Sequence, residues 1–139
     1  MNSNNKIIIF TGVTGILVLS ILAIASISVN DVFAQCPTSI TIGAYPNKGT
    51  VGFETNTLPV SLSGQLKTCG EPMGNTFITI TGIDGPDKQV KTSNSGDYGI
   101  GVRLSPGVYT IQAIYEGDDQ NDPTSATKTI TANANPQNN

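Results

Sequence analysis

Hydrophobic and polar positions alternate with a period of two along much of the chain after residue 35. The clearest runs are 58–66 (LPVSLSGQL), 98–104 (YGIGVRL) and 108–115 (VYTIQAIY). Successive side chains of a β-strand point to opposite faces of a sheet, so this alternation predicts strands with one buried face. The inward-facing residues are expected to be Leu58, Val60 and Leu62, then Tyr98, Ile100, Val102 and Leu104, then Tyr109, Ile111, Ala113 and Tyr115.

Four further segments are short and rich in β-branched residues, and they lie at 38–44, 76–83, 88–92 and 124–131. The segment 88–92 (KQVKT) is charged, which is typical of an edge strand. Turn sequences rich in Gly, Pro, Asn and Asp separate the runs. About seven strands at intervals of roughly 8–12 residues predict an all-β sandwich, and we expect one such domain.

The N-terminus has the pattern of a targeting segment. Lys6 precedes an apolar run at 7–29, which is followed by Val32-Phe33-Ala34. This small-x-small pattern predicts cleavage after Ala34, with a mature chain that begins at Gln35. The run is also long enough to span a bilayer as a helix, so an uncut membrane anchor at 7–29 is the alternative. The expected organisation is a hydrophobic targeting helix in 1–34, a sandwich in 35–132 and a disordered polar tail in 133–139.

Two cysteines follow the targeting segment, Cys36 and Cys69. In an exported chain, an even number of cysteines predicts disulfide pairing. The closed loop would contain 34 residues, and it would stabilise the fold by roughly 3–4 kcal/mol in the chain-entropy description. A metal or redox role would need closer spacing or more ligands.

Composition excludes several classes of function. Charged residues make up 12% of the 139-residue chain, the net charge is −3, and there is no His. A basic surface for nucleic acid is therefore missing, and so is the commonest general base. No nucleophile motif such as G-x-S-x-G occurs, so we expect a protein that is not an enzyme.

An acidic loop at 117–123 raises the question of a metal. Asp118, Asp119 and Asp122 are the candidate calcium ligands, because calcium binds six to eight oxygen atoms and sandwich loops can supply them. The alternative is that aspartate is simply favourable in turns. No D-x-D-x-D-G loop is present.

The segment 91–119 carries two motifs, T-x-x-x-G-x-Y and P-G-x-Y-x-x-x-A-x-Y-x-G-D. They are formed by Thr92, Gly96 and Tyr98, and by Pro106, Gly107, Tyr109, Ala113, Tyr115, Gly117 and Asp118. In these motifs the chain resembles the bacterial-type Ig-like domains of cell-surface and secreted proteins, over most of the mature sequence. Carboxypeptidase-regulatory-like and transthyretin-like domains share these turns and are the alternative. The chain departs from the family at Gln120-Asn121, where an aromatic residue is usual.

The resemblance implies a Greek-key Ig-like sandwich. Gly96 and Gly107 suit turn positions with positive φ. Tyr109 follows a corner, where its ring can fill the edge of the core while its hydroxyl bonds back to the chain as a tyrosine corner.

The expected function is that of a non-catalytic exported module at the cell surface or outside the cell, with an adhesion, envelope-structural or accessory binding role. Its partner would be an extracellular protein or a glycan. A calcium- or carbohydrate-binding accessory protein and a surface domain anchored through 7–29 are the alternatives.

Tyr45 and Phe53 are expected to close the end of the core, the alternative being exposed ligand contacts. Lys88 and Lys91 protect an edge strand, which favours a monomer.

Overall fold

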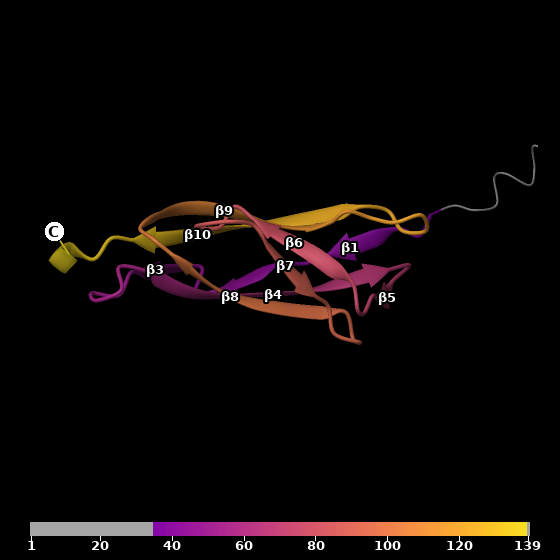
Figure 1. Ribbon diagram of the computed structural model, residues 1–139, viewed down its shortest axis with the longest axis horizontal. Helices are drawn as coiled ribbons and strands as arrows, with labels where there is room; N and C mark the ends of the chain where they lie inside the picture. Colours follow the sequence, from indigo (N-terminus) through magenta and orange to yellow (C-terminus); the bar gives the residue numbers. More distant parts are fainter. Residues whose placement is uncertain (1–34, 139) are drawn as a thin grey trace, which may run out of the picture. The chain divides into compact units, whose positions relative to one another are not determined.

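The computed structural model describes residues 35–138, and the ten strands found there form two β-sheets (Figure 1). One turn of 3-10 helix, η1 (Pro136–Asn138), follows the last strand. Within this part of the chain, no helix has the length and apolar character needed to cross a membrane. The expected targeting helix, the anchor at 7–29 and Ala34 of the cleavage site lie outside the described residues, as does Asn139.

The first sheet is built around one long central strand, β4. On one side β4 pairs antiparallel with β8 and β5, and on the other with β1 and β2. The strands are β1 (Thr38–Ile40), β2 (Gly43–Tyr45), β4 (Leu58–Thr68), β5 (Glu71–Pro72) and β8 (Asp97–Leu104).

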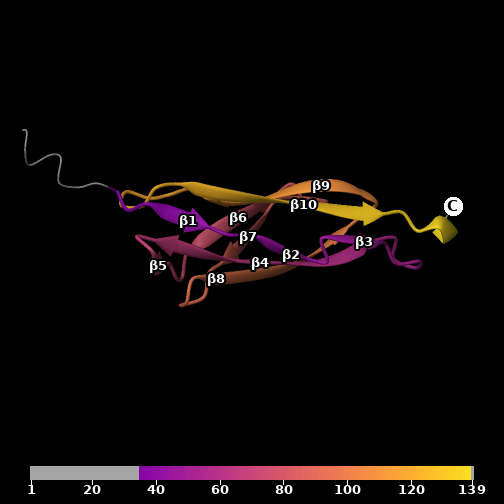
Figure 2. The same ribbon diagram turned by 180° about the vertical axis from the view of Figure 1, so that it is seen from behind.

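The second sheet has the order β3-β10-β9-β6-β7, and only β3 runs parallel to its neighbour. Its strands are β3 (Lys48–Thr50), β6 (Phe77–Thr81), β7 (Lys88–Lys91), β9 (Gly107–Tyr115) and β10 (Thr124–Asn133). The strand β7 is an edge strand, as its charged sequence predicted. Figures 1 and 2 show β9 and β10 in one layer and β4 and β8 in the other. The architecture is therefore an all-β sandwich.

The core lies between the two sheets and confirms the predicted alternation. Leu62 and Leu104 of the first sheet and Ile111 and Ile130 of the second are all at most 1% exposed. Every inward position predicted on β4, β8 and β9 is buried except Ile100 and Tyr109, which are half-buried against the core. Apolar side chains at alternate positions thus hold the sheets together through the hydrophobic effect.

The structure has ten strands where about seven were expected. The predicted strand at 38–44 is split into β1 and β2, although Ile40 opposite Leu66 and Gly43 opposite Ser63 keep one register. The split occurs because the Thr41 carbonyl accepts a hydrogen bond from the Tyr98 hydroxyl. The Gln65 N–H donates to Thr41 Oγ1 instead, at 2.9 Å.

The two other additional strands, β3 and β5, contain only three and two residues. Segments this short contain no alternation that a sequence pattern could reveal. Moreover, β3 pairs with β10, the last strand of the chain, so nothing near it in the sequence indicates its partner.

Residues 133–138 of the segment predicted as a polar tail make contacts with the rest of the domain. Asn133 is the last residue of β10. Beyond it, Asn135 Nδ2 donates to the Val51 carbonyl at 3.4 Å, and Asn138 Nδ2 donates to Asn56 Oδ1 at 3.1 Å. These bonds attach the segment, as far as residue 138, to the loop between β3 and β4.

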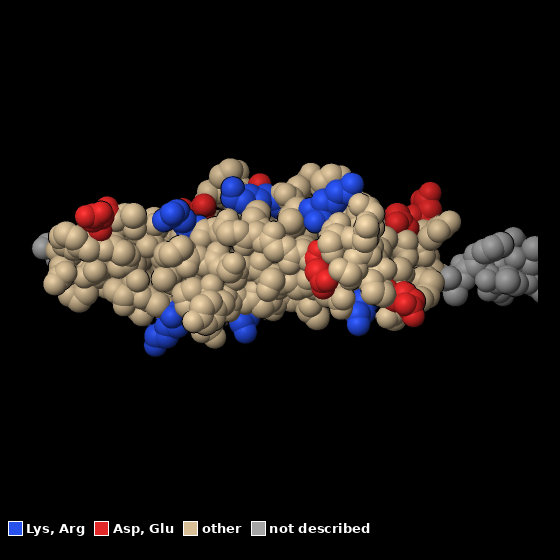
Figure 3. Space-filling view, turned by 90° about the horizontal axis from the view of Figure 1, so that it is seen from below, with Lys and Arg blue, Asp and Glu red and all other residues tan. Residues whose placement is uncertain are grey.

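The outer face of the first sheet is largely uncharged. Its outward positions on β4 and β8 include Ser61, Ser63, Gly99 and Gly101, which are all exposed. Figure 3 shows a broad area without charged side chains on this face, with Lys, Arg, Asp and Glu side chains around its margins. The sheet is therefore open to solvent on this side and lined by small residues.

Candidate functional site

A disulfide joins Cys36 and Cys69, with their Cα atoms 5.2 Å apart, and this confirms the predicted pairing. Cys69 and Gly70 have φ of 49° and 83° and form the two-residue turn between β4 and β5. Two positive φ values in succession are typical of the tight turns that connect hairpin strands. The disulfide therefore links the residue two positions before β1 to the tip of a hairpin.

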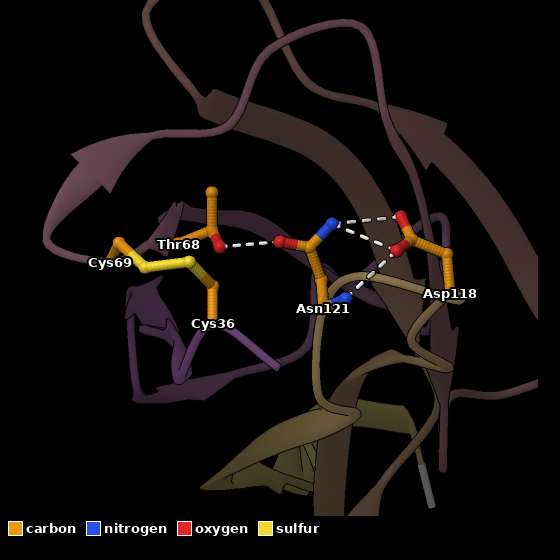
Figure 4. The surroundings of a disulfide bond; sticks show 5 residues. All are labelled: Cys36, Thr68, Cys69, Asp118 and Asn121. Atoms are coloured by element: carbon orange, nitrogen blue, oxygen red, sulfur yellow. Dashed lines mark hydrogen bonds between the residues drawn. A yellow bond between two sulfur atoms is a disulfide. The ribbon is translucent and has the colours of Figure 1, made fainter. Parts of the chain in front are cut away.

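The acidic loop packs beside this disulfide through Asp118 and Asn121. The Asp118 carboxylate accepts hydrogen bonds from the Tyr115 hydroxyl at 2.8 Å, from the Gln120 N–H at 2.8 Å and from the Asn121 N–H at 2.9 Å. Figure 4 shows Asn121 between Asp118 and Thr68, donating to the first through Nδ2 and accepting from the second through Oδ1. The loop is thereby fixed to the end of β4.

The three candidate calcium ligands, Asp118, Asp119 and Asp122, are not brought together as a metal-binding group in the described part of the chain. Among residues 35–138, no three His, Cys, Asp or Glu side chains are grouped so that they could hold a metal ion. The oxygens of Asp118 are occupied by donors of its own loop, which is the turn chemistry that was the alternative. Asn121 supplies part of this packing.

The hydrogen bonds of the loop change the acidity of two groups. The Gln120 N–H, followed by the Tyr115 hydroxyl and the Asn121 amide, lowers the pKa of Asp118 from its ordinary value of 3.8. Burial, together with the nearby Asp118, raises the pKa of Tyr115 to about 12. At neutral pH the carboxylate is therefore ionised and the phenol protonated, as their hydrogen bond requires.

We expect Asp118→Asn to reduce the acid sensitivity of the fold. The lowered folded-state pKa of Asp118 means that its contribution to stability is present above the ordinary pKa and is lost as pH falls through the folded-state pKa. Melting temperatures from about pH 7 to about pH 3 should fall more steeply for the wild type than for the variant. Asp84, whose pKa is also lowered, is unchanged in both proteins and serves as the internal reference. Parallel curves would show that Asp118 does not couple to folding.

The hydroxyl of Tyr109 donates to the Ser105 carbonyl at 3.0 Å, which is the bond back to the chain that the sequence led us to expect. Gly96, with φ of 77°, occupies the positive-φ turn position predicted for it. Gly107 does not, because it has no positive φ and is already the first residue of β9, opposite Ala132. The turn before it is made by Ser105 and Pro106.

We expect Tyr109→Phe to destabilise the domain by about 1 kcal/mol, because the Ser105 carbonyl loses its donor. Thermal unfolding should show a decrease of roughly 4–8 °C in melting temperature. Tyr45→Phe is the matched control, since the Tyr45 side chain is 82% exposed. A melting temperature of Tyr109→Phe equal to that of the control would contradict a stabilising tyrosine corner.

A shallow groove of about 820 Å³ lies on the outer side of the first sheet. Tyr45, Ser61 and Gly101 line it from β2, β4 and β8, while Arg103 and Lys88 supply cations. Tyr45 is 82% exposed and, outside the groove, Phe53 is 60% exposed, so these aromatics do not close the core as expected. Tyr45 is the last residue of β2, and it lies opposite Ser61, an outward position of β4.

One carboxylate, Asp84, also lines the groove. It accepts a hydrogen bond from the Ser105 N–H at 3.1 Å, and its contacts with Ser105 lower its pKa. Lys88 and Arg103 are both exposed at the surface. The groove therefore combines an aromatic ring, a hydroxyl, two cations and one partly engaged anion with two prolines, Pro46 and Pro59.

Among the groove residues, the sequence indicated only Tyr45 as a possible ligand contact. Ser61, Gly101 and Arg103 belong to strands that are distant from Tyr45 in the sequence, and they meet it because β2 and β8 pair with opposite sides of β4. No family model matches the chain, and no curated protein is significantly similar to it.

Proposed function

We propose that this protein is an exported, non-catalytic module that acts at the cell surface or outside the cell, as an adhesion, envelope-structural or accessory binding domain. The observation that carries the proposal is the Cys36–Cys69 disulfide. Disulfides persist in oxidising environments outside the cytosol. The apolar run at 7–29 lies directly before this domain in the sequence, as an export signal or membrane anchor does.

We further propose that the sandwich is Ig-like and of Greek-key type. From β4 the chain passes to the second sheet, where β6 and β7 pair, and it then returns to the first sheet, where β8 pairs with β4. It next forms β9, which pairs with β6 and β10. Tyr109 near the start of β9 supports the same assignment, because Ig-type sandwiches carry a tyrosine corner in this region. The position of the disulfide is different from that in antibody domains, where it joins the two sheets.

Two carboxyl groups and the lack of histidine support a non-catalytic role. The pKa values of Asp84 and Asp118 are both lowered, by hydrogen bonds from Ser105 and from the 118–121 loop. A general acid or base at neutral pH needs a pKa near 7, so a carboxyl must be shifted upwards. The chain also has no His to activate a hydroxyl nucleophile.

The intact, non-reduced mass of the protein from its native cells tests the proposal, with medium, membrane and cytoplasmic fractions measured separately. We expect a chain that begins at Gln35 and is lighter by two hydrogens, found outside the cytoplasm. A full-length, disulfide-bonded chain in the membrane fraction would support export with the segment 7–29 as an anchor. A reduced, full-length chain in the cytoplasm would overturn the proposal.

A further inference from the structure

Three residues form a row across the outer face of the first sheet. Tyr45 of β2 lies opposite Ser61 of β4, which lies opposite Gly101 of β8. Neighbouring strands are about 4.8 Å apart, so the row extends for roughly 10 Å across the strands. Arg103 lies two residues beyond Gly101 on the same face of β8, and all four residues line the groove. A ligand in the groove would thus meet an aromatic ring at one end and a guanidinium at the other.

Gly101 leaves open space at the bottom of the groove, and the fold does not require glycine at this position. Its φ is not positive, and a Cβ added there would meet no atom within 4 Å. Glycine in the middle of a strand is unfavourable, and it often marks a place where a ligand approaches the backbone closely. Gly64, by contrast, lies directly beneath other protein atoms. Neither backbone conformation nor crowding therefore requires glycine at position 101, and its bare backbone is open to contact from outside the domain.

The lining favours a chain of sugars over an apolar ligand. An aromatic side chain as exposed as Tyr45 offers a flat apolar surface with a polar hydroxyl, on which the apolar face of a sugar ring can pack. Ser61 adds a hydroxyl that can donate or accept. Arg103 presents a planar set of donors that matches a carboxylate. The cations Arg103 and Lys88 outnumber the anion Asp84, which already accepts a bond from Ser105.

We propose that this groove binds an acidic glycan, with Tyr45 packed against one sugar ring and Arg103 paired with the carboxylate of another. The inference rests on the proposed function, since an exported module meets glycans outside the cell. Its ligand would lie across the strands, over Ser61 and Gly101. The row of three strands provides room for a short stretch of sugars, and the shallow, open form of the groove suits a chain that continues at both ends.

Calorimetric titration of the purified full chain with hexagalacturonate tests the proposal. We expect the protein to bind hexagalacturonate. Its affinity should be about tenfold lower for maltohexaose, a neutral glycan of the same length, and for hexaglutamate, an acidic peptide. Equal affinity for hexagalacturonate and maltohexaose would overturn the role of Arg103. Equal affinity for hexaglutamate would mean that charge alone attracts the ligand, and it would overturn the glycan assignment.

Four variants form two matched pairs for this titration. Tyr45→Ala should weaken binding about tenfold or more, while Phe53→Ala, which removes an exposed aromatic outside the groove, should leave it unchanged. Gly101→Val should abolish binding by filling the space at the bottom of the groove. Gly99→Val should not, because Gly99 lies on the same strand but does not line the groove, and a Cβ there makes only an ordinary 3.7 Å contact.

The melting temperatures of both valine variants should equal or exceed that of the wild type, because valine is favoured in strands and neither position is crowded. Absence of binding by the wild type, or equal loss in both members of a pair, would overturn the glycan site. Neither result bears on the proposed function, because the intact mass tests the compartment and the disulfide state separately.

Discussion

Gly64→Ala is expected to destabilise the domain by about 3 kcal/mol or more, far above the usual cost of a glycine substitution in a strand. The added Cβ would overlap the carbonyl oxygen of Thr41 and come within 2.6 Å of the Tyr98 hydroxyl. The carbonyl belongs to the backbone and the hydroxyl is bonded to it, so neither group can move away cheaply. The melting temperature should fall by more than about 10 °C.

The physical reason lies in how Tyr98 reaches the neighbouring chain. Tyr98 lies opposite Gly64 on the adjacent strand, and its hydroxyl passes over this glycine to donate to the Thr41 carbonyl. Burial raises the pKa of Tyr98 to about 12, so the hydroxyl remains a donor across the accessible pH range. A side chain at Gly64 would occupy the path of this bond.

Gly101→Ala is the matched control for this substitution, because it places the same methyl group on the neighbouring strand where nothing lies within 4 Å. The control should be neutral or stabilising by up to about 1 kcal/mol, since alanine restricts the unfolded chain more than glycine does. Differential scanning calorimetry of the two variants makes the comparison. Similar melting temperatures for both would contradict the close approach of Tyr98 to Gly64.

Three long strands, β4, β8 and β9, and their buried faces were predictable from the sequence because each has its own alternation. The faces of β4, β8 and β9 follow from the periodic placement of residues such as Leu62, Val102 and Ile111. The break between β1 and β2 was not predictable, because it depends on a hydrogen bond between Thr41 and Tyr98, which are 57 residues apart. Local patterns contain no information about such a bond.

The two candidate sites differ in the same way. The disulfide was predictable because the pairing of two cysteines has only one solution. The role of Asp118 was not, because the same carboxylate suits a cation or its own loop, and only its donors from Tyr115, Gln120 and Asn121 decide between them. The groove depends on the register of three strands, which no single segment of sequence specifies.

Removal of the Cys36–Cys69 disulfide is expected to lower the free energy of unfolding by about 3–4 kcal/mol, through the greater entropy of the open unfolded chain. Cys36→Ser should show this loss in chemical denaturation. The backbone of Cys36 also donates a hydrogen bond to Gln120 at 3.0 Å and accepts one from Asp122 at 3.3 Å, both in the acidic loop. These bonds give no reason to expect a smaller loss of unfolding free energy. These bonds exist only in the folded state and do not restrict the unfolded one.

The two cysteine variants and their combination distinguish loss of the covalent bond from loss of a side chain. Cys36→Ser, Cys69→Ser and the double variant should lose nearly equal free energies, because each removes the same bond and the effects are therefore not additive. The wild type in reductant should match them. Losses that add in the double variant, or a wild type unaffected by reduction, would show that the side chains rather than the cross-link stabilise this end of the sandwich. Cys69 and serine are L-residues of similar size, so we expect the positive-φ turn with Gly70 to be equally strained in all the variants.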